Sequence, residues 1–263
     1  MVGAPERSSQ YHGCAIPPEV YDIAFGWDPQ PEVNRLLLLA RQAGLKPRSV
    51  LELGCGTGRL LPSLQKAVPE VVGLELSPAM AQFARARCNA DIVVGDMGDF
   101  SLGRTFELIF ASANTLRHVH SDEAIARMWG CIGDHLTPGG VFATDQELGF
   151  AAEAEKLGRP ARWMLSRGQV LVHVAWQVIE PPCPQTRCCT VEWVFESRLG
   201  APRGTWREQF TLRTYDADEF LRLATADGRL RALGIYEIRD PYLVRTPVEK
   251  ALGRMLVVVQ RRG

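Results

Sequence analysis

The sequence VLELGCGTGRL at residues 50–60 decides the fold of this chain. Val50 to Leu53 has the pattern of a buried strand, and three glycines follow at alternate positions, Gly54, Gly56 and Gly58. A glycine turn between a strand and a helix lets the backbone approach a polar cofactor closely, because glycine carries no Cβ. The stretch therefore predicts a cofactor site in an α/β fold. The alternative is a tight turn that binds nothing.

The composition indicates a globular protein with a sizeable core. Of the 263 residues 46% are hydrophobic, and 30 basic residues balance 30 acidic ones. Zero net charge argues against binding driven by the charge of nucleic acid or of an anionic membrane. Residues 1–13 lack an apolar run of signal-peptide length, and no stretch approaches the roughly 20 apolar residues of a membrane span. The seven cysteines are expected to be reduced thiols in a cytoplasmic protein.

Apolar strands and amphipathic helices alternate from Pro31 to about Gln146, which predicts a parallel, doubly wound sheet. Strands are expected over residues 50–53, 71–76, 92–94, 108–111 and 141–144. Helices are expected around 36–40, after an N-cap at Ser77 with Pro78 following, and from Ser121 to a stop at Pro138-Gly139-Gly140.

This alternation breaks after the fifth strand. The next β segments, over 169–180, 190–198 and 205–215, suggest an antiparallel meander. A helix over 217–226 and strands over 233–238 and 255–260 then complete the first sheet.

The predicted fold class is therefore α/β, with a mostly parallel sheet of seven strands and an antiparallel insert after the fifth. The predicted divisions are an N-terminal cap segment (1–30), a cofactor-binding core (31–146), a lid-like insert (147–214) and the completion of the core (215–263).

Side chains after the next two strands narrow the choice of cofactor. Arg59 stands where a dinucleotide-binding turn would have its third glycine. Glu75 ends the second strand, where a ribose diol would lie. Asp96 and Met97 follow the third strand, where a carboxylate and a thioether can border adenine.

These segments resemble the class I S-adenosylmethionine-dependent methyltransferases, well over residues 19–146 and loosely in the last two strands. The resemblance is carried by LELGCGTG at 51–58, GLELSPAM at 73–80 and GDM at 95–97. Tyr21-Asp22 and NTLRH at 114–118 are similar to the small-molecule branch, which includes glycine N-methyltransferase and amino-sugar N,N-dimethyltransferases. That branch often carries an antiparallel insert after the fifth strand.

The resemblance implies S-adenosylmethionine as cofactor and S-adenosylhomocysteine as product. It implies that Glu52 and the glycine backbone hold the methionine part, that Glu75 takes both ribose hydroxyls, and that Leu76 packs on adenine. The cofactor-binding residues that it implies are Tyr21, Glu52, Gly54, Cys55, Gly56, Gly58, Glu75, Leu76, Met80, Asp96, Met97 and Ala111. Cys55 occupies a position where the family often has a small residue, and is expected to be a filler without catalytic function.

Methyl transfer from a sulfonium needs an acceptor lone pair in line with the methyl group, and needs neither a metal nor a covalent intermediate. Asn114 and His118 are four residues apart and share a face if that segment is helical. A histidine ring can take a proton near neutral pH, and a tyrosine ring can face the sulfonium. We predict catalytic roles for Tyr21, Asn114 and His118. The alternatives are a helix-packing tyrosine and a surface or capping histidine.

The acceptor is expected to bind at the rim of the sheet, beneath the insert. Glu147 follows the fifth strand and can hold an ammonium or be solvated. Four tryptophans, at 163, 176, 193 and 206, either line an apolar acceptor site or build the buried face of the insert. The predicted acceptor-binding residues are Asn114, Arg117, Glu147, Trp163 and Trp176.

The favoured function is methylation of a nitrogen or oxygen of a small molecule. We expect no nucleic-acid or membrane partner, and the sequence is compatible with a homodimer. One alternative is methylation of RNA or protein, and another is a silent cofactor-binding module. Cys183, Cys188 and Cys189 can bind a soft metal or an arsenical, but their C-x4-CC spacing matches no standard zinc pattern, so no metal is predicted.

Overall fold

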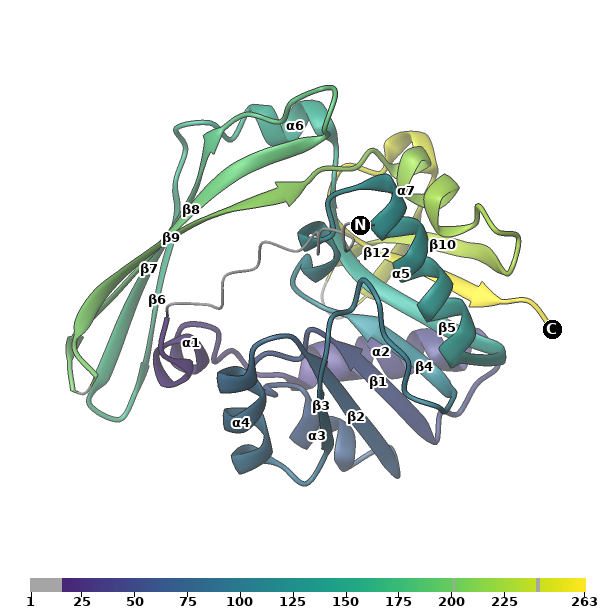
Figure 1. Cartoon of the computed structure of the whole chain (residues 1–263), viewed down its shortest axis with the longest axis horizontal. Helices are drawn as coiled ribbons and strands as arrows, with labels where there is room; N and C mark the ends of the chain where they lie inside the picture. The colour runs from purple at the N-terminus through teal and green to yellow at the C-terminus, as the bar shows by residue number, and fades with distance from the viewer. Residues whose placement is uncertain (1–15, 201, 240–241) are drawn as a thin grey trace, which may run out of the picture.

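An eight-stranded sheet, in the order β11-β10-β12-β5-β4-β1-β2-β3, forms the centre of the computed structural model, which describes residues 16–200, 202–239 and 242–263 (Figure 1). Its strands are β1 (Ser49–Leu53), β2 (Glu70–Glu75), β3 (Asp91–Val94), β4 (Phe106–Ala111), β5 (Leu136–Leu148), β10 (Leu230–Arg239), β11 (Tyr242–Thr246) and β12 (Gly253–Arg261). Strands β1 to β5 pair in parallel. The strand order reverses between β1 and β4, and open α/β sheets bind ligands at the carboxyl ends of the strands beside such a reversal.

Helices cover both faces of this sheet. On one face lie α2 (Gln30–Gln42), α3 (Leu61–Gln65) and α4 (Pro78–Arg87), and on the other lie α5 (Asp122–His135) and α7 (Ala217–Ala224). The side chains of β1 alternate between them, because Val50 packs with the first group and Leu51 and Leu53 with the second. Helix α4 begins as predicted, since the Ser77 hydroxyl accepts a hydrogen bond from the Met80 N–H at 3.4 Å.

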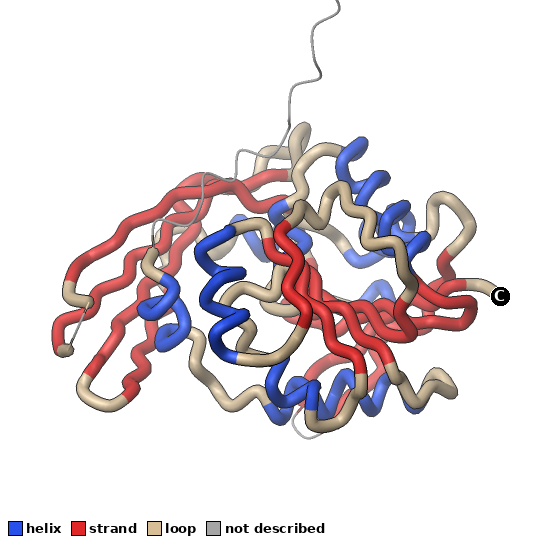
Figure 2. Tube along the Cα trace, turned by 60° about the horizontal axis from the view of Figure 1, so that its bottom comes forward, coloured by secondary structure: helices blue, strands red, loops and turns tan. Residues whose placement is uncertain are grey.

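Four antiparallel strands form a second sheet, called here the lid sheet. They are β6 (Ala161–Arg167), β7 (Val170–Glu180), β8 (Cys188–Leu199) and β9 (Gly204–Arg213). The short helix α6 (Phe150–Ala154) leads into the lid sheet from the core, and α1 (Pro18–Ala24) lies between the lid sheet and α4 (Figures 1 and 2). Val20 and Ile23 of α1 share a buried cluster with Val172, Val174 and Phe195 of the lid sheet.

The α/β fold with an antiparallel insert is confirmed, but two strands were not predicted. The central sheet has eight strands instead of the predicted seven, because β11 pairs with β10 as an exposed hairpin at its edge. Strand β6 was also missed. Both strands are largely exposed, so neither carries the apolar run that identifies a buried strand.

Boundaries around β5 also differ from the prediction. Helix α5 ends at His135, and Pro138-Gly139-Gly140 lies inside β5, where the pairing with β4 shifts register. Strand β5 continues to Leu148, so Glu147 lies within the strand and not after it. The described residues also include two short 3-10 helices, η1 (Thr115–His118) and η2 (Val248–Lys250).

The predicted N-terminal cap segment lies partly outside the described residues, and its described part contains α1 and the connection to α2. Over the three described ranges, no helix has both the length and the hydrophobicity that crossing a bilayer requires.

Candidate functional site

The glycine turn lies between β1 and α3, at the reversal of strand order. Gly54, Gly56 and Gly58 have φ angles of 65°, 55° and 74°, which glycine adopts without a steric penalty. A Cβ at Gly54 would lie 2.5 Å from Thr115 Cγ2, at the start of η1 in the loop after the neighbouring β4. The turn therefore needs glycine both for its backbone conformation and for its close approach to the next loop.

Glu75, at the end of β2, connects the glycine turn to the start of α4. Its Oε2 accepts a hydrogen bond from the Gly56 N–H, and its Oε1 accepts one from the Ser77 N–H, each at 2.8 Å. Burial raises the pKa of Glu75, while these backbone N–H donors and that of Leu76 oppose the shift. The carboxylate is thus oriented at the carboxyl end of β2, the position that the sequence predicted for a ribose diol.

Two buried polar atoms beside the turn have no hydrogen-bond partner among the described residues, Oε2 of Glu52 and Nη1 of Arg59. The other carboxyl oxygen of Glu52 accepts a hydrogen bond from the Ser112 hydroxyl at 3.4 Å. Nη2 of Arg59 donates to both carboxyl oxygens of Glu32 in α2, at 2.8 and 2.7 Å. Burial raises the pKa of Glu52 to about 8, although the charge of Arg59 opposes the shift. A free acceptor and a free donor of this kind fit a ligand that carries both an ammonium and a carboxylate.

The loop after β4 is held in an uncommon conformation. Ala113 and Asn114 have φ angles of 55° and 62°, which are unfavourable for residues with a Cβ. The Asn114 N–H donates to Asp145 Oδ1 at 3.4 Å, and its side-chain oxygen accepts a hydrogen bond from the Glu147 N–H. Arg254 of β12 pairs with Asp145 in turn. These contacts hold Asn114 against the end of β5, within reach of a ligand at the sheet edge.

The condition under which Asn114 and His118 would share a face, an α-helix over this segment, is not met. Residues Thr115–His118 form the 3-10 helix η1, in which residues three apart share a face, and Asn114 precedes it in the left-handed conformation. The half-buried His118 ring stacks on Phe210 of β9 at 5.3 Å, and burial lowers its pKa to about 4. Its ring is therefore neutral at pH 7 and a weaker base than a solvated histidine.

Tyr21 lies on α1 over the glycine turn. A Cβ at Gly56 would be 3.8 Å from its Cε1. The same ring packs on Phe25 at 4.4 Å and stacks with Trp193 and Phe195 of the lid sheet at 6.2 and 6.4 Å. Tyr21 thus contacts both the turn and the lid sheet, so the position suits both the catalytic prediction and its alternative, helix packing.

Glu147 and Arg117 of the predicted acceptor site have charged partners. Glu147 pairs with the Lys156 ammonium at 2.8 Å, and Lys156 also lies 3.1 Å from Glu153 and over the Trp176 ring. Arg117 is buried, with its guanidinium 3.0 Å from Glu153 and its Nε donating to the Arg213 carbonyl at 2.8 Å. The partners of Arg117 are thus structural, which does not favour a direct contact with the acceptor.

The remaining predicted cofactor residues lie at or just after the ends of β1 to β4, and on α4. Leu76, Asp96 and Met97 are half-buried, whereas Met80 and Ala111 are buried. Cys55 turns its thiol toward Gly73, where a Cβ would lie 2.6 Å from Sγ, and burial raises its pKa. These contacts agree with a filler role for Cys55.

Trp163 fastens the lid sheet to α1, since its Nε1 donates to the Ala24 carbonyl at 2.8 Å. Trp163, Trp193 and Trp206 pack against the cluster between α1 and the lid sheet, whereas Trp176 packs near the connection to the core. The four tryptophans therefore do not form one lining.

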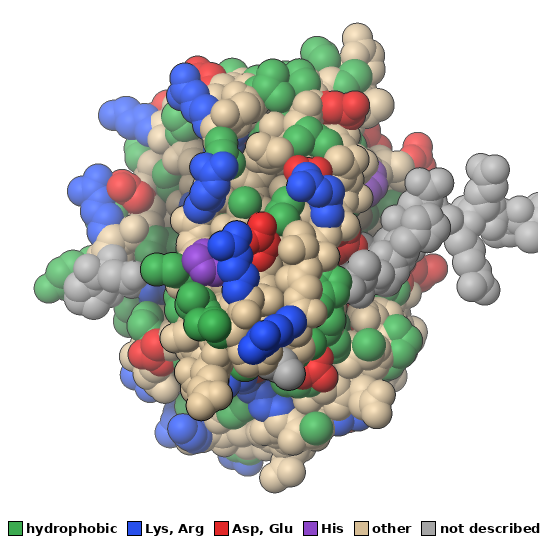
Figure 3. Space-filling view, turned by 90° about the vertical axis from the view of Figure 1, so that its left-hand side faces the viewer, with side chains coloured by type: hydrophobic (Ala, Val, Ile, Leu, Met, Phe, Trp, Pro, Cys, Tyr) green, Lys and Arg blue, Asp and Glu red, His purple; other side chains and the backbone are tan. Residues whose placement is uncertain are grey.

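On the other side of the lid sheet, side chains that include His173 and Glu196 surround a concavity of about 520 Å³. Figure 3 shows basic, acidic and hydrophobic side chains interspersed at this end of the molecule.

Sequence reasoning assigned no role to four polar residues near the site, Asp22, Arg59, Asp145 and Arg254, and quoted Asp22 only as part of the resemblance. Arg59 was noticed only as a departure from the dinucleotide pattern. A signal was available for Asp22, because a carboxylate between apolar residues of a helix must find partners when it is buried. The contacts of Asp145 and Arg254 join β5 to β12, more than a hundred residues apart in sequence, and carry no local signal.

Comparison with known proteins agrees with this geometry. Residues 50–140 match the sequence model of a family described as a methyltransferase domain. The dTDP-3-amino-3,4,6-trideoxy-alpha-D-glucopyranose N,N-dimethyltransferase of Streptomyces venezuelae is 32% identical over 131 residues, which are 48% of this chain and 55% of that protein. The dTDP-4-amino-2,3,4,6-tetradeoxy-D-glucose N,N-dimethyltransferase of Saccharopolyspora spinosa is 33% identical over 127 residues, 47% of this chain and 51% of that protein. The chain thus spans about half the length of these curated relatives.

Solved structures extend the likeness to nearly the whole chain. Streptomyces venezuelae DesVI superposes with a TM-score of 0.78 at 23% identity, covering 95% of this chain and 100% of that one. The sugar N-methyltransferase KedS8 of a Streptoalloteichus species has a TM-score of 0.75 at 22% identity, covering 100% and 99%. At these identities the likeness establishes the fold.

Proposed function

We propose that this chain, whose residues 50–140 form a methyltransferase domain, transfers a methyl group from S-adenosylmethionine to an amine of a small molecule, of the amino-sugar class. The observation that carries the proposal is the set of buried polar atoms around the glycine turn. Glu75 presents its carboxylate at the end of β2, and Glu52 and Arg59 each keep one buried polar atom without a partner. A buried polar atom without a hydrogen-bond partner destabilises the fold unless a bound ligand supplies that partner.

In this proposal each group of the cofactor has a residue that holds it. Glu52 would take the α-ammonium and Arg59 the carboxylate of the methionine part, and Glu75 would take the ribose hydroxyls. Leu76, Asp96 and Met97 would border adenine. The bound cofactor supplies an electrophilic methyl group, and the remaining task of the protein is to orient the acceptor and exclude water.

The acceptor would bind between the loop after β4 and the end of β5. Glu147 already holds an ammonium, that of Lys156, at 2.8 Å, so its surroundings suit a cationic amine. An amine must lose its proton before it can attack the methyl group. His118, with a pKa of about 4, can accept a hydrogen bond from it but stays a weak base, and Tyr21 and Asn114 would position the two reactants.

Support for an amino-sugar acceptor comes from relatives such as the Streptomyces venezuelae and Saccharopolyspora spinosa enzymes, whose names specify dTDP-amino sugars. Residues 31–146 and 215–263 would bind the cofactor, and 147–214 would close over the acceptor. A cytoplasmic location and a homodimer stay predictions.

The test combines binding with turnover. Isothermal titration with S-adenosylhomocysteine should show binding by the wild type and at least about tenfold weaker binding by Glu75→Ala, since hydrogen bonds to a carboxylate are lost. Glu70→Ala is the matched control, because Glu70 starts the same strand but is exposed and pairs with Arg104. Mass spectrometry with a dTDP-amino sugar should show a gain of one or two methyl groups. Absence of binding by the wild type would refute the proposal.

A further inference from the structure

Asp22 of α1 is a buried carboxylate that connects three distant segments. Its side chain is 2% exposed, and its Oδ1 accepts a hydrogen bond from the Thr57 hydroxyl at 2.9 Å. Its two carboxyl oxygens also pair with the guanidinium groups of Arg87 and Arg167. Nη2 of Arg167 donates in addition to the Asp22 backbone carbonyl at 3.1 Å. Thr57 belongs to the glycine turn, Arg87 ends α4, and Arg167 ends β6 at the hairpin to β7.

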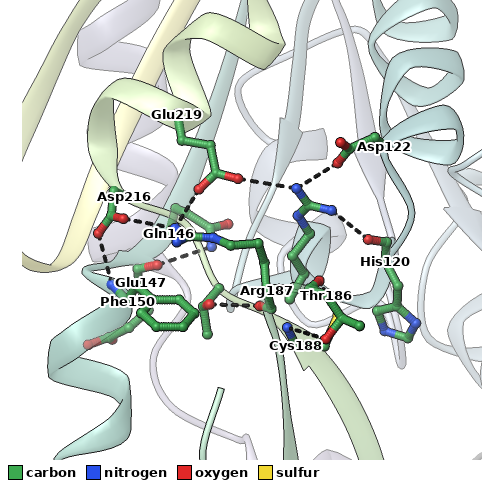
Figure 4. Close-up of polar contacts among 12 residues, drawn as sticks. His120, Asp122, Gln146, Glu147, Phe150, Thr186, Arg187, Cys188, Asp216 and Glu219 are labelled. Atoms are coloured by element: carbon green, nitrogen blue, oxygen red, sulfur yellow. Dashed lines mark hydrogen bonds and ion pairs between the residues drawn. The ribbon is translucent and has the colours of Figure 1, made fainter. Parts of the chain in front are cut away.

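This hairpin is the end of the lid sheet that lies away from its chain connections to the core. The chain enters the lid sheet through α6 and leaves it at the end of β9, both at the opposite end (Figure 1). At this opposite end, where the chain connects to the core, ion pairs hold the lid sheet. Arg187 pairs with Asp216 and Glu219, and Arg213 pairs with Asp122 (Figure 4).

At the hairpin between β6 and β7, the lid sheet contacts α1 through apolar packing, hydrogen bonds and an ion pair. Apolar packing and the Trp163 hydrogen bond hold the face of the lid sheet that covers α1. The ion pair between Arg167 and Asp22 holds the β6–β7 hairpin, called here the lid tip. The Arg167 side chain is 52% exposed, whereas that of Arg87 is 27% exposed. If the ion pair between Arg167 and Asp22 breaks, the Asp22 carboxylate still has Arg87 as a counter-ion. Movement of the lid tip away from α1 therefore leaves no unpaired buried charge.

The remaining side-chain contact of Asp22 is with Thr57 of the glycine turn, the proposed cofactor site. Thr57 is 4% exposed and lies between Gly56 and Gly58, so its hydroxyl bonds to Asp22 only when the turn has the observed conformation. We propose that Asp22 is a positioning residue that couples docking of the lid tip to the cofactor turn, so that cofactor binding and lid closure stabilise each other. The inference rests on the proposed function. Such coupling is reciprocal by thermodynamic linkage.

The binding test uses the full chain and S-adenosylhomocysteine in isothermal titration. Arg167→Ala should weaken binding by about five- to tenfold, within the usual range of coupling between sites. Arg167→Lys should recover part of the loss. Arg198→Ala is the matched control, because Arg198 is also an exposed lid arginine, 71% exposed, but pairs within its own strand with Glu196. It should bind like the wild type.

Hydrogen exchange supplies a readout that a merely structural contact would not change. S-adenosylhomocysteine should slow exchange at the hairpin around Gly168 in the wild type and in Arg198→Ala, but not in Arg167→Ala or Asp22→Asn. Equal affinity of wild type and Arg167→Ala, or absence of ligand-dependent protection in the wild type, would overturn the coupling alone. A wild type that binds no S-adenosylhomocysteine would instead overturn the proposed function.

Discussion

Binding of S-adenosylhomocysteine at pH 7 should release about 0.4–0.9 proton, and Glu52 should be its source. Glu52 is 3% exposed at the end of β1, and burial raises its pKa to about 8. Its Oε2 is buried and has no hydrogen-bond partner among the described residues, so this oxygen can accept a hydrogen bond from the ligand ammonium in the proposed complex. The carboxyl group of the free protein is then mostly protonated at pH 7.

The size of the effect follows from this pKa. A carboxyl group with a pKa of about 8 is roughly 90% protonated at pH 7 and roughly 10% protonated at pH 9. An ammonium in hydrogen-bond contact favours the carboxylate and lowers its pKa by about 1–3 units. Binding should thus release about 0.4–0.9 proton at pH 7 and about 0.1 at pH 9.

Isothermal titration in buffers of different ionisation enthalpy measures this number as the slope of the observed enthalpy. Glu52→Gln keeps the shape of the side chain but cannot ionise, so its slope at pH 7 should fall to near zero and its affinity should drop. Glu70→Gln, on the exposed start of β2, should keep the wild-type slope. A wild-type slope near zero, or an unchanged slope in Glu52→Gln, would refute the reasoning.

Three further predictions concern the surroundings of the site. Gly54→Ala should lower the free energy of unfolding by about 3 kcal/mol, because the added methyl group would lie 2.5 Å from a side-chain atom of Thr115. Gly44→Ala, also at positive φ but in open space, should lower it by about 1 kcal/mol. Urea denaturation of both variants compares these losses. The wild type should lose stability as the pH falls from 6.5 toward 4. Folding lowers the pKa of His118 from 6.5 to about 4, so in this range the unfolded chain binds a proton that the folded chain does not. Between pH 7 and pH 5, the free energy of unfolding should fall less in His118→Gln than in the wild type. Arg117→Ala should cost about 3 kcal/mol, because the buried Glu153 carboxylate keeps only Lys156 as a counter-ion among the described residues and the Arg213 carbonyl loses its donor. Arg162→Ala, on the exposed lid surface, should stay within about 0.5 kcal/mol, and similar losses in the two variants would contradict the structural role of Arg117.

Local patterns in the sequence predicted the core of the fold. The strand at Val50 to Leu53 and the glycine turn after it follow from neighbouring residues, as does the start of α4 at Ser77. These features depend on backbone conformation and on side-chain contacts a few residues away. The 3-10 helix at Thr115–His118 was not predicted, because it depends on how Asn114 is held by β5.

The sequence by itself thus determined the alternating strands and helices from β1 to β5, the glycine turn and the acidic residues Glu52 and Glu75 beside it. Only the tertiary structure decided which charges meet. Asp22 bonds to Thr57, Arg87 and Arg167, which are 35, 65 and 145 residues away in sequence. A buried charge must be paired, but its partner is chosen by the packing of whole elements, and no periodicity along the chain records that choice.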